Sequence, residues 1–436
     1  MNAVVSYPGI FQDARQAALA FHERGQLAAF VTALVLHDNN IVKRFGEVCL
    51  PATFNQRLAR EFRRRAVTEI PAERVISYPW LDGLRTILSR YSGNPVLADI
   101  AWDAMSGSFD RTVARRHLRG AQLVYAFEYT ARHTFERAKA EGMARVLAMP
   151  SLDSAQFEAI KSAEVSRFPE LLTRHQGYFE RRFPARYERR RAEIALADLV
   201  VANSELTRRS HVRAGADPNK IVSVPLAAPP PIAAVEPSSL AKDDALSVVW
   251  AGTVSVGKGA HYFVEAWRAL RAGNRARARV YGKINLPERV LRPLPEGLEL
   301  VGHVPQKELL TAFAQADVLA FPTLSDGFGS VVLEAFSCGL PVITTRSAGA
   351  SEFITHGLNG LVIPAADARA LTDALRWCLD NRDALYRMRF AALDTARRWQ
   401  WPDYRRMLIA KITEGLGSAG HVVDFGPERL DYGAPV

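Results

Sequence analysis

The chain of 436 residues has few cysteines and no long hydrophobic run. Its three cysteines, Cys49, Cys338 and Cys378, form no pair at metal-ligand spacing and no disulfide framework, which favours a reducing compartment such as the cytoplasm. The most apolar early stretch, residues 27–36, is far shorter than the roughly 20 residues that a membrane span needs, and no basic and apolar leader precedes it. We therefore expect a protein that is neither exported by that route nor transmembrane.

The formal net charge of +10 comes mostly from arginine. Such a charge suits phosphate or an anionic membrane surface, although a coding bias toward arginine explains it equally well. The basic runs at residues 60–65, 181–182 and 189–191 are either solvated surface or a face that lies on anionic lipid. No known RNA- or DNA-binding motif accompanies this spread charge, so we expect no nucleic-acid partner.

The stretch from Asp317 to Thr345 is the most informative part of the sequence. It predicts a buried strand at residues 318–321 that ends at Pro322, because the apolar run is short and comes after a segment with a helical pattern. A glycine-rich turn at residues 326–329 and a short helix at residues 330–338 follow, with Gly339 at the C′ position of that helix. Residues 340–345 then form the next strand.

A glycine loop that leads into a helix presents backbone N–H groups and favours an anionic ligand such as a diphosphate. Glu334 lies one helical turn beyond Ser330, where its carboxylate can accept hydrogen bonds from sugar hydroxyls. Asp326 lies in the turn, on the phosphate side. The plainer alternative is that Glu334 is a solvated residue of an ordinary helix.

Alternating strands and helices before this stretch predict an α/β fold with a parallel sheet. The expected strands are residues 4–7, 28–36, 123–127, 144–149, 199–202 and 221–225, and helices are expected at residues 13–24, 135–142 and 207–214. Ser204 can cap the last of these helices. The proline-rich segment that follows indicates a linker, so the length suits two domains of roughly 200 residues each.

The second half repeats the pattern, beginning with a strand at residues 246–251 and a glycine turn at residues 252–259. Lys258 in this turn can neutralise phosphate charge, unless it is simply an exposed loop lysine. Further strands are expected at residues 279–281, 298–301 and 361–363, and helices at 307–316, from Asp367 and from Arg382. After a helix at residues 399–413, we expect order to end near Gly415.

The stretch from Asp326 to Glu334 resembles the E-x7-E signature of retaining glycosyltransferases of family four. It has an acid, then Gly-Phe-Gly, and then a glutamate eight positions after the acid, with Asp326 in place of the first glutamate of the signature. The resemblance is strong over residues 195–415 and weak before them. It implies the GT-B architecture, in which two Rossmann-like domains face a central cleft. The expected division is 1–232 for the acceptor-side domain, 233–245 for a linker, 246–398 for the nucleotide-sugar domain, 399–415 for a helix that crosses back, and 416–436 for a tail.

The resemblance also implies roles for individual residues. Lys258 matches a lysine that contacts the donor diphosphate, and Asp326 and Glu334 complete the expected catalytic set. Thr253 stands where many members have an arginine, so Arg346 or Lys283 could supply the second cation. The expected donor-binding residues are Gly252, Thr253, Tyr281, Val304, Gly327, Phe328, Gly329 and Ser330.

The acceptor side is less defined. Glu128, Tyr129 and His133 follow a strand whose end borders the acceptor in the family, so they are expected acceptor contacts. The catalytic-site histidine of some members has no clear equivalent, and His133 is as readily explained as a helix-surface residue.

The implied reaction moves a sugar from a nucleotide diphosphate sugar to a hydroxyl of a glycan or lipid-linked acceptor, with retention at the anomeric carbon, as in polysaccharide biosynthesis. The leaving diphosphate would take the acceptor proton. No strand-terminated Asp-x-Asp motif is present, so we expect neither a metal nor a cofactor. A sugar-nucleotide epimerase or a phosphorylase on the same fold, or less readily a basic nucleic-acid-binding protein, remains an alternative.

Overall fold

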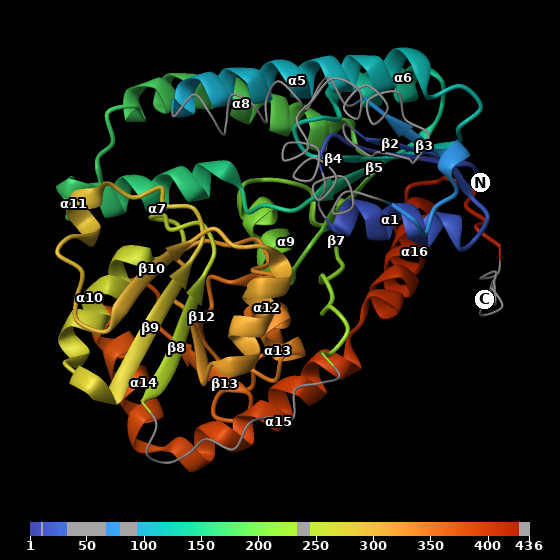
Figure 1. The fold of residues 1–436 in the computed structure, drawn as a ribbon. Coiled ribbons are helices and arrows are strands. Elements are labelled where there is room, and N and C mark those ends of the chain that lie inside the picture. Colours follow the sequence, from blue (N-terminus) through green and yellow to red (C-terminus); the bar gives the residue numbers. More distant parts are fainter. Residues whose placement is uncertain (10–11, 33–66, 79–93, 233–244, 427–436) are drawn as a thin grey trace, which may run out of the picture.

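Two parallel β-sheets form the framework of the protein in the computed structural model, which describes residues 1–9, 12–32, 67–78, 94–232 and 245–426 (Figure 1). Helices cover both faces of each sheet, and the predicted α/β class is confirmed. Several predictions concern residues outside the described ones: Cys49, the basic run at residues 60–65, the end of the strand predicted at 28–36, and most of the predicted linker.

The described strands of the first sheet follow the order β3-β2-β1-β4-β5-β6-β7, and all neighbours pair in parallel. Their bounds are β1 Ala3–Tyr7, β2 Leu27–Thr32, β3 Val75–Ser77, β4 Leu123–Phe127, β5 Ala144–Met149, β6 Leu199–Ala202 and β7 Ile221–Ser223. The helices are α1 Gln12–His22, α5 Pro95–Arg116, α6 Arg132–Ala140, α7 Ser154–Arg167, α8 Gln176–Leu196 and α9 Glu205–Arg213.

Alternate residues of these strands enter two separate cores, because successive side chains of a strand point to opposite faces. Tyr125 and Val146 pack with α1 on one face, whereas Val124 and Leu147 pack with α5 and α6 on the other. The strands are apolar on both faces, as expected of a parallel sheet covered on both sides.

The second sheet has the described strand order β10-β9-β8-β11-β12-β13, also parallel throughout. Its strands are β8 Leu246–Ala251, β9 Ala276–Tyr281, β10 Leu298–Gly302, β11 Val318–Phe321, β12 Val342–Thr345 and β13 Gly360–Ile363. Its helices are α10 Ala260–Leu270, α11 Glu288–Leu291, α12 Gln306–Gln315, α13 Val331–Ser337, α14 Ala368–Asp380 and α15 Arg382–Arg398. Helices α10 and α14 cover one face, and α12 and α13 cover the other.

The last helix, α16 Trp401–Ser418, leaves the second sheet and packs against the first (Figure 1). Its buried residues Leu408, Ile412 and Leu416 join the core that α1 shares. The prediction that order ends near Gly415 is wrong, because α16 continues to Ser418 and Phe425 is buried beside Phe21. The prediction was wrong because it took the glycines as a sign of disorder. Gly415 instead lies inside the helix, where a Cβ atom would come within 2.4 Å of Leu199.

Helix α7 and the 3-10 turn after it, η2 Pro169–Leu171, belong to the first half of the sequence but contact the second sheet's core. Leu171 is buried in that core, and Phe168 packs against it. His261 of α10 pairs with Glu164 of α7 at 2.9 Å between Nε2 and Oε2. In Figure 1, α7 lies between α8 and the second sheet. Helix α7 therefore ties the two halves of the protein together.

Within the described part of the chain, no helix combines the length and the apolar character that crossing a membrane requires.

Candidate functional site

The loop after β8 lies directly on the end of β11, and Gly259 makes this close approach possible. Gly259 has φ +66°, and a Cβ atom there would come within 1.9 Å of the Pro322 carbonyl oxygen, so only glycine fits. The carbonyl of Gly257 accepts hydrogen bonds from the Thr323 hydroxyl at 2.9 Å and from the Leu324 N–H at 2.9 Å. These contacts fix the loop that carries Lys258 against the loop that carries Asp326.

As a result, the Lys258 ammonium forms an ion pair with the Asp326 carboxylate. The two side chains are 27% and 17% exposed, so the pair is partly screened from water. The ammonium also lies 5.8 Å from the centre of the Phe321 ring. Two residues predicted to share a site are thus in direct contact, although 68 positions separate them in the sequence.

Glu334 lies in the first turn of α13, and its backbone N–H donates to the Ser330 carbonyl at 2.9 Å. Burial raises the pKa of its carboxyl group, while a hydrogen bond with the side chain of Gln306 opposes that rise. Gln306 begins α12, two residues after Val304. The structure therefore brings Glu334 close to the loop for which a base contact is predicted.

Short backbone contacts join the loops at the carboxyl ends of β8, β9 and β10. The Gly252 N–H donates to the Tyr281 carbonyl at 3.0 Å, and the Gly282 N–H donates to the Gly302 carbonyl at 2.8 Å. Gly282 has φ +137° and lies against the Gly252 carbonyl, where a Cβ atom would come within 1.7 Å. Thr253 is exposed beside this junction. The predicted donor-binding residues of these loops therefore lie along one edge of the second sheet.

The first sheet contacts this edge at Gly327. The Gly327 carbonyl accepts hydrogen bonds from the hydroxyls of Ser204 and Thr207, the latter at 3.0 Å. Both hydroxyls belong to the start of α9, where Ser204 is the N-cap, as predicted. A Cβ atom on Gly327 would come within 2.3 Å of the Pro150 carbonyl oxygen. Sequence reasoning missed this contact between the domains, because capping a helix already explained Ser204.

The predicted acceptor residues follow β4 on the first sheet. One oxygen of Glu128 accepts a hydrogen bond from the Ser151 hydroxyl at 2.7 Å and lies 3.4 Å from the Arg190 guanidinium. Its other oxygen, Oε2, is buried and has no hydrogen-bond partner among the described residues. Ser151 lies next to Gly327, so this carboxylate borders the contact between the two sheets.

Tyr129 is held rigidly and has φ +71°, an uncommon value for a residue with a side chain. Its N–H donates to Glu193, its ring stacks on Trp102 at 4.4 Å, and its hydroxyl donates to Asp103. Arg189 and Arg190 lie 4.7 Å from the ring centre. With only 3% of its surface exposed, Tyr129 is a packing residue in this conformation.

His133 lies on the outer side of α6, with a side chain 41% exposed and its Nδ1 atom 3.2 Å from a carboxylate oxygen of Glu136. The surface interpretation of this residue fits the structure better than an acceptor contact does.

The arginines of α8 are mostly occupied within the protein. Arg182, Arg186 and Arg189 pair with Asp103, Asp99 and Asp110 of α5. The guanidinium of Arg191 donates to the Ala214 carbonyl at 2.7 Å, and Arg181 is exposed. A large part of this basic run therefore fastens α8 to the rest of the first domain.

The fold is that of the GT-B class. Sucrose-phosphate synthase from Thermosynechococcus elongatus matches with a TM-score of 0.62 at 14% identity, over 96% of this chain and all of that one. The Anabaena protein Alr3699/HepE, in a crystal structure with UDP-glucose, matches with a TM-score of 0.58 at 15% identity, over 95% of this chain and all of that one. The predicted GT-B architecture is thereby confirmed.

Sequence comparison finds one match to a family model: residues 245–381, in the second domain, match the model of the glycosyl transferases group 1. D-inositol 3-phosphate glycosyltransferase of Corynebacterium urealyticum is 34% identical over 105 residues, which are 24% of this chain and 25% of that protein. The same enzyme of Pseudarthrobacter chlorophenolicus is 38% identical over 94 residues, 22% of each chain. The match spans about a quarter of the length of these curated relatives.

Proposed function

We propose that the protein is a retaining glycosyltransferase that moves a sugar from a nucleotide diphosphate sugar to a hydroxyl of a glycan or lipid-linked acceptor. The observation that carries this proposal is the contact of Lys258 with Asp326 at the point where the second sheet meets the first. A cation and an acid held together there suit the diphosphate and the sugar of one donor molecule. The family of the second domain supports the same reaction class, and nothing in the site favours an epimerase or a phosphorylase.

In this proposal, the bond between the anomeric carbon and the diphosphate oxygen breaks, and the acceptor oxygen forms its bond on the same face of the sugar. The acceptor proton passes to the leaving diphosphate. Lys258 stabilises the negative charge that grows on the diphosphate in the transition state, which lowers the barrier. Asp326 contacts the transferred sugar, and Glu334 accepts hydrogen bonds from donor hydroxyls.

The remaining donor contacts are proposed for Gly252, Thr253, Tyr281, Val304 and the turn at residues 327–330. On the acceptor side, the buried free oxygen of Glu128 makes it the preferred contact of the three predicted residues. We further propose a role in polysaccharide or glycolipid synthesis, in the cytoplasm or on the inner face of a membrane.

UDP-glucose is the first donor to test, because Alr3699/HepE was crystallised with it. We expect Glu334→Gln to weaken UDP-glucose binding by roughly 10- to 150-fold, since a hydrogen bond to a charged group contributes about 1.5–3 kcal/mol. We expect Lys258→Ala to lower kcat more than donor affinity, because its contact strengthens in the transition state. Calorimetry and initial rates measure the two effects.

Lys411→Ala is the matched control, because Lys411 forms an exposed ion pair with Glu414 on α16, away from this site. It should leave binding and rate unchanged. If folded Glu334→Gln and Lys258→Ala proteins both keep wild-type kinetics, the donor does not bind at these loops and the assignment is wrong.

A further inference from the structure

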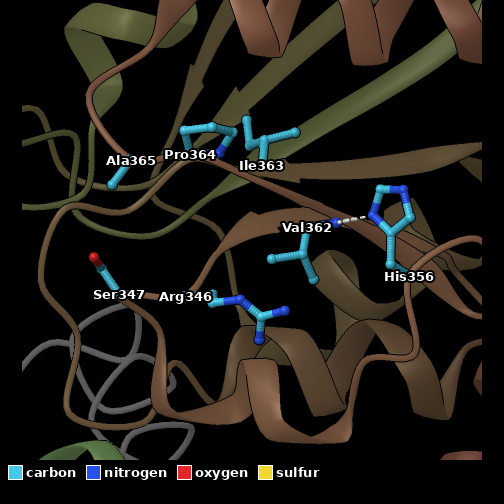
Figure 2. Close-up of a pocket in the computed structure, with 7 residues that line it drawn as sticks. All are labelled: Arg346, Ser347, His356, Val362, Ile363, Pro364 and Ala365. Carbon is cyan, nitrogen blue, oxygen red and sulfur yellow. Dashed lines mark hydrogen bonds between the residues drawn. The ribbon is translucent and has the colours of Figure 1, made fainter.

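A cavity of about 350 Å³ opens at the carboxyl ends of β12 and β13 (Figure 2). Arg346 directly follows β12, and Pro364 directly follows β13. Because the last residues of these two strands pair with each other, Arg346 and Pro364 lie side by side. Figure 2 shows the Arg346 guanidinium extended toward the side of the cavity that Val362 and His356 form. A cavity of this volume is at the lower end of the range for small-molecule sites and fits a group the size of one sugar.

Arg346 is exposed to solvent, and its charge has no partner among the described residues. No carboxylate pairs with it, and it makes no hydrogen bond among the residues that the structure describes. By contrast, Arg382 of the same domain pairs with Asp317 at 2.9 Å, and Arg389 donates to the Ala316 carbonyl at 2.6 Å. A planar guanidinium without a partner can bind a carboxylate or a phosphate through two parallel hydrogen bonds.

The other polar groups of the cavity can also donate. The His356 Nδ1 atom accepts a hydrogen bond from the Val362 N–H at 3.1 Å, so a neutral ring carries its proton on Nε2 and donates there. The Ser347 hydroxyl is a further donor, and none of the described residues that line the cavity is acidic. Apolar side chains of residues 362–365 complete the wall. The lining therefore suits an anionic group attached to a compact body.

The position of the cavity relates it to the proposed donor site. The Asp326 N–H donates to the Ser347 carbonyl at 2.9 Å, so the cavity begins beside the loop proposed to contact the transferred sugar. In the sheet, β8, β9 and β10 lie on one side of β11, and β12 and β13 lie on the other. A donor whose base lies near Val304 and whose sugar lies near Asp326 therefore extends its far end toward this cavity.

We infer that the cavity binds a carboxylate or phosphate group of the substrate, carried either by the transferred sugar or by the acceptor beside it. The inference rests on the proposed function, because that function sets the direction of the donor. In this inference Arg346 binds the anionic group in the cavity and does not serve as the second cation that contacts the donor diphosphate.

Calorimetry with two pairs of probes distinguishes the sources. UDP-glucuronate is compared with UDP-glucose to test the sugar, and glucose 6-phosphate is compared with glucose in the presence of UDP to test the acceptor. We expect one anionic probe to bind the wild type at least tenfold more tightly than its neutral counterpart. Arg346→Ala should remove that preference and leave the affinity for UDP unchanged. Arg346→Lys should restore only part of the preference, because an ammonium cannot form the bidentate contact.

Arg277→Ala is the matched control, since Arg277 is an exposed arginine on β9 of the same sheet. An equal loss of preference in Arg277→Ala would overturn the inference, as would the absence of any preference in the wild type. If UDP binds normally and neither anionic probe is preferred, the cavity inference fails and the donor site stands. If UDP and both UDP-sugars do not bind, while glucose 6-phosphate binding depends on Arg346, the donor proposal fails and the anion site stands.

Discussion

Lys258 and Asp326 neutralise part of each other's charge in the structure, which has a direct consequence for ligand binding. A diphosphate near Lys258 competes with the Asp326 carboxylate for the same ammonium. A donor that carries its sugar gives Asp326 the hydroxyl groups of that sugar to contact, whereas a free nucleotide diphosphate lacks the transferred sugar. Under the proposed function, the Asp326 carboxylate would therefore weaken binding of the free nucleotide diphosphate more than binding of the complete donor.

Asp326→Ala tests this difference between the two ligands. We expect UDP to bind the variant as tightly as the wild type, or more tightly, because Lys258 no longer has a competing partner. We expect kcat/KM for UDP-glucose to fall at least tenfold, because the proposed sugar contact is lost. Asp326→Asn, which keeps the shape of the side chain, is the control for folding of the loop. Equal losses of UDP and UDP-glucose binding would contradict the proposed role.

Particular residues of the site were predictable from the sequence to different degrees. Lys258 and Asp326 lie in glycine turns and Glu334 lies in a short helix. These local features can be recognised in the sequence, so the sequence pattern indicates these three residues. The Ser204 and Thr207 hydroxyls on the Gly327 carbonyl join positions 123 and 120 residues apart, and no local pattern signals such a contact. The same holds for Arg346, whose lack of a partner is visible only in three dimensions.

Among the helices, α16 shows why glycines are difficult to interpret from sequence alone. Gly415 and Gly417 both lie inside this helix, where glycine lowers stability by roughly 1 kcal/mol relative to alanine. A Cβ atom at Gly415 would come within 2.4 Å of the buried Leu199 side chain, whereas at Gly417 it would meet nothing within 4 Å. Gly415 therefore permits close packing of α16 on β6, whereas Gly417 is not needed for packing.

The two glycines form a matched pair of substitutions. Gly417→Ala should raise the thermal midpoint of unfolding, since it gains about 1 kcal/mol of helix propensity at no steric cost. Gly415→Ala should lower it, because Leu199 is enclosed in the first core and can move only by disturbing its neighbours. Thermal unfolding followed by circular dichroism compares them. A stabilised Gly415→Ala protein would show that α16 does not pack closely on β6.

Asp13 of helix α1 is a buried acid that lies near strand β4 and helix α16. Burial raises the pKa of the Asp13 carboxyl group to about 6, while the Ala14 N–H, which donates to it at 2.9 Å, opposes the rise. Among the described residues, Tyr125 of β4 and Tyr404 of α16 are titratable groups near this carboxyl group. Because the folded state holds this proton more strongly than the unfolded chain, the group makes the free energy of unfolding fall as the pH rises from about 4 to about 6.

Asp13→Asn should remove this dependence and keep the hydrogen bond from Ala14. We expect the stability of the variant relative to the wild type to increase by on the order of 2 kcal/mol between pH 4.5 and pH 7.5. Urea unfolding at the two pH values measures the change. A constant difference between the proteins would mean that Asp13 titrates in its ordinary range.

At the scale of the whole molecule, the sequence predicts the two sheets better than it predicts how they meet. The strand at residues 246–251 and the N-cap Ser204 are found as predicted, and the helix predicted from Asp367 is found there, because apolar runs and capping residues act locally. Helix α7 packs on the second sheet through Glu164 and Phe168, whose partner His261 comes about a hundred residues later. The hydrophobic pattern of α7 does not specify which core will bury it.

The net charge of +10 also belongs to the whole molecule, and the structure limits which charges can meet a membrane. Arg182, Arg186 and Arg189 are held by acids of α5, so these side chains contribute little free charge. Arg181 is the exposed arginine at the start of this run. If the first domain lies on anionic lipid through α8, binding should therefore depend on Arg181 more than on its paired neighbours.

We expect the protein to bind vesicles that contain anionic lipid at low salt and to be released by added salt, because exposed charges are screened within roughly 10 Å at 0.1 M. Arg181→Glu changes two charges at this face, and at about 1 kcal/mol per cation it should weaken vesicle binding roughly ten- to thirtyfold. Arg277→Glu makes the same change on the second domain and should have little effect. Sedimentation with anionic and with neutral vesicles measures the binding. Equal losses in both variants would show a response to net charge alone, and binding to neutral vesicles as strongly as to anionic ones would exclude the electrostatic contact.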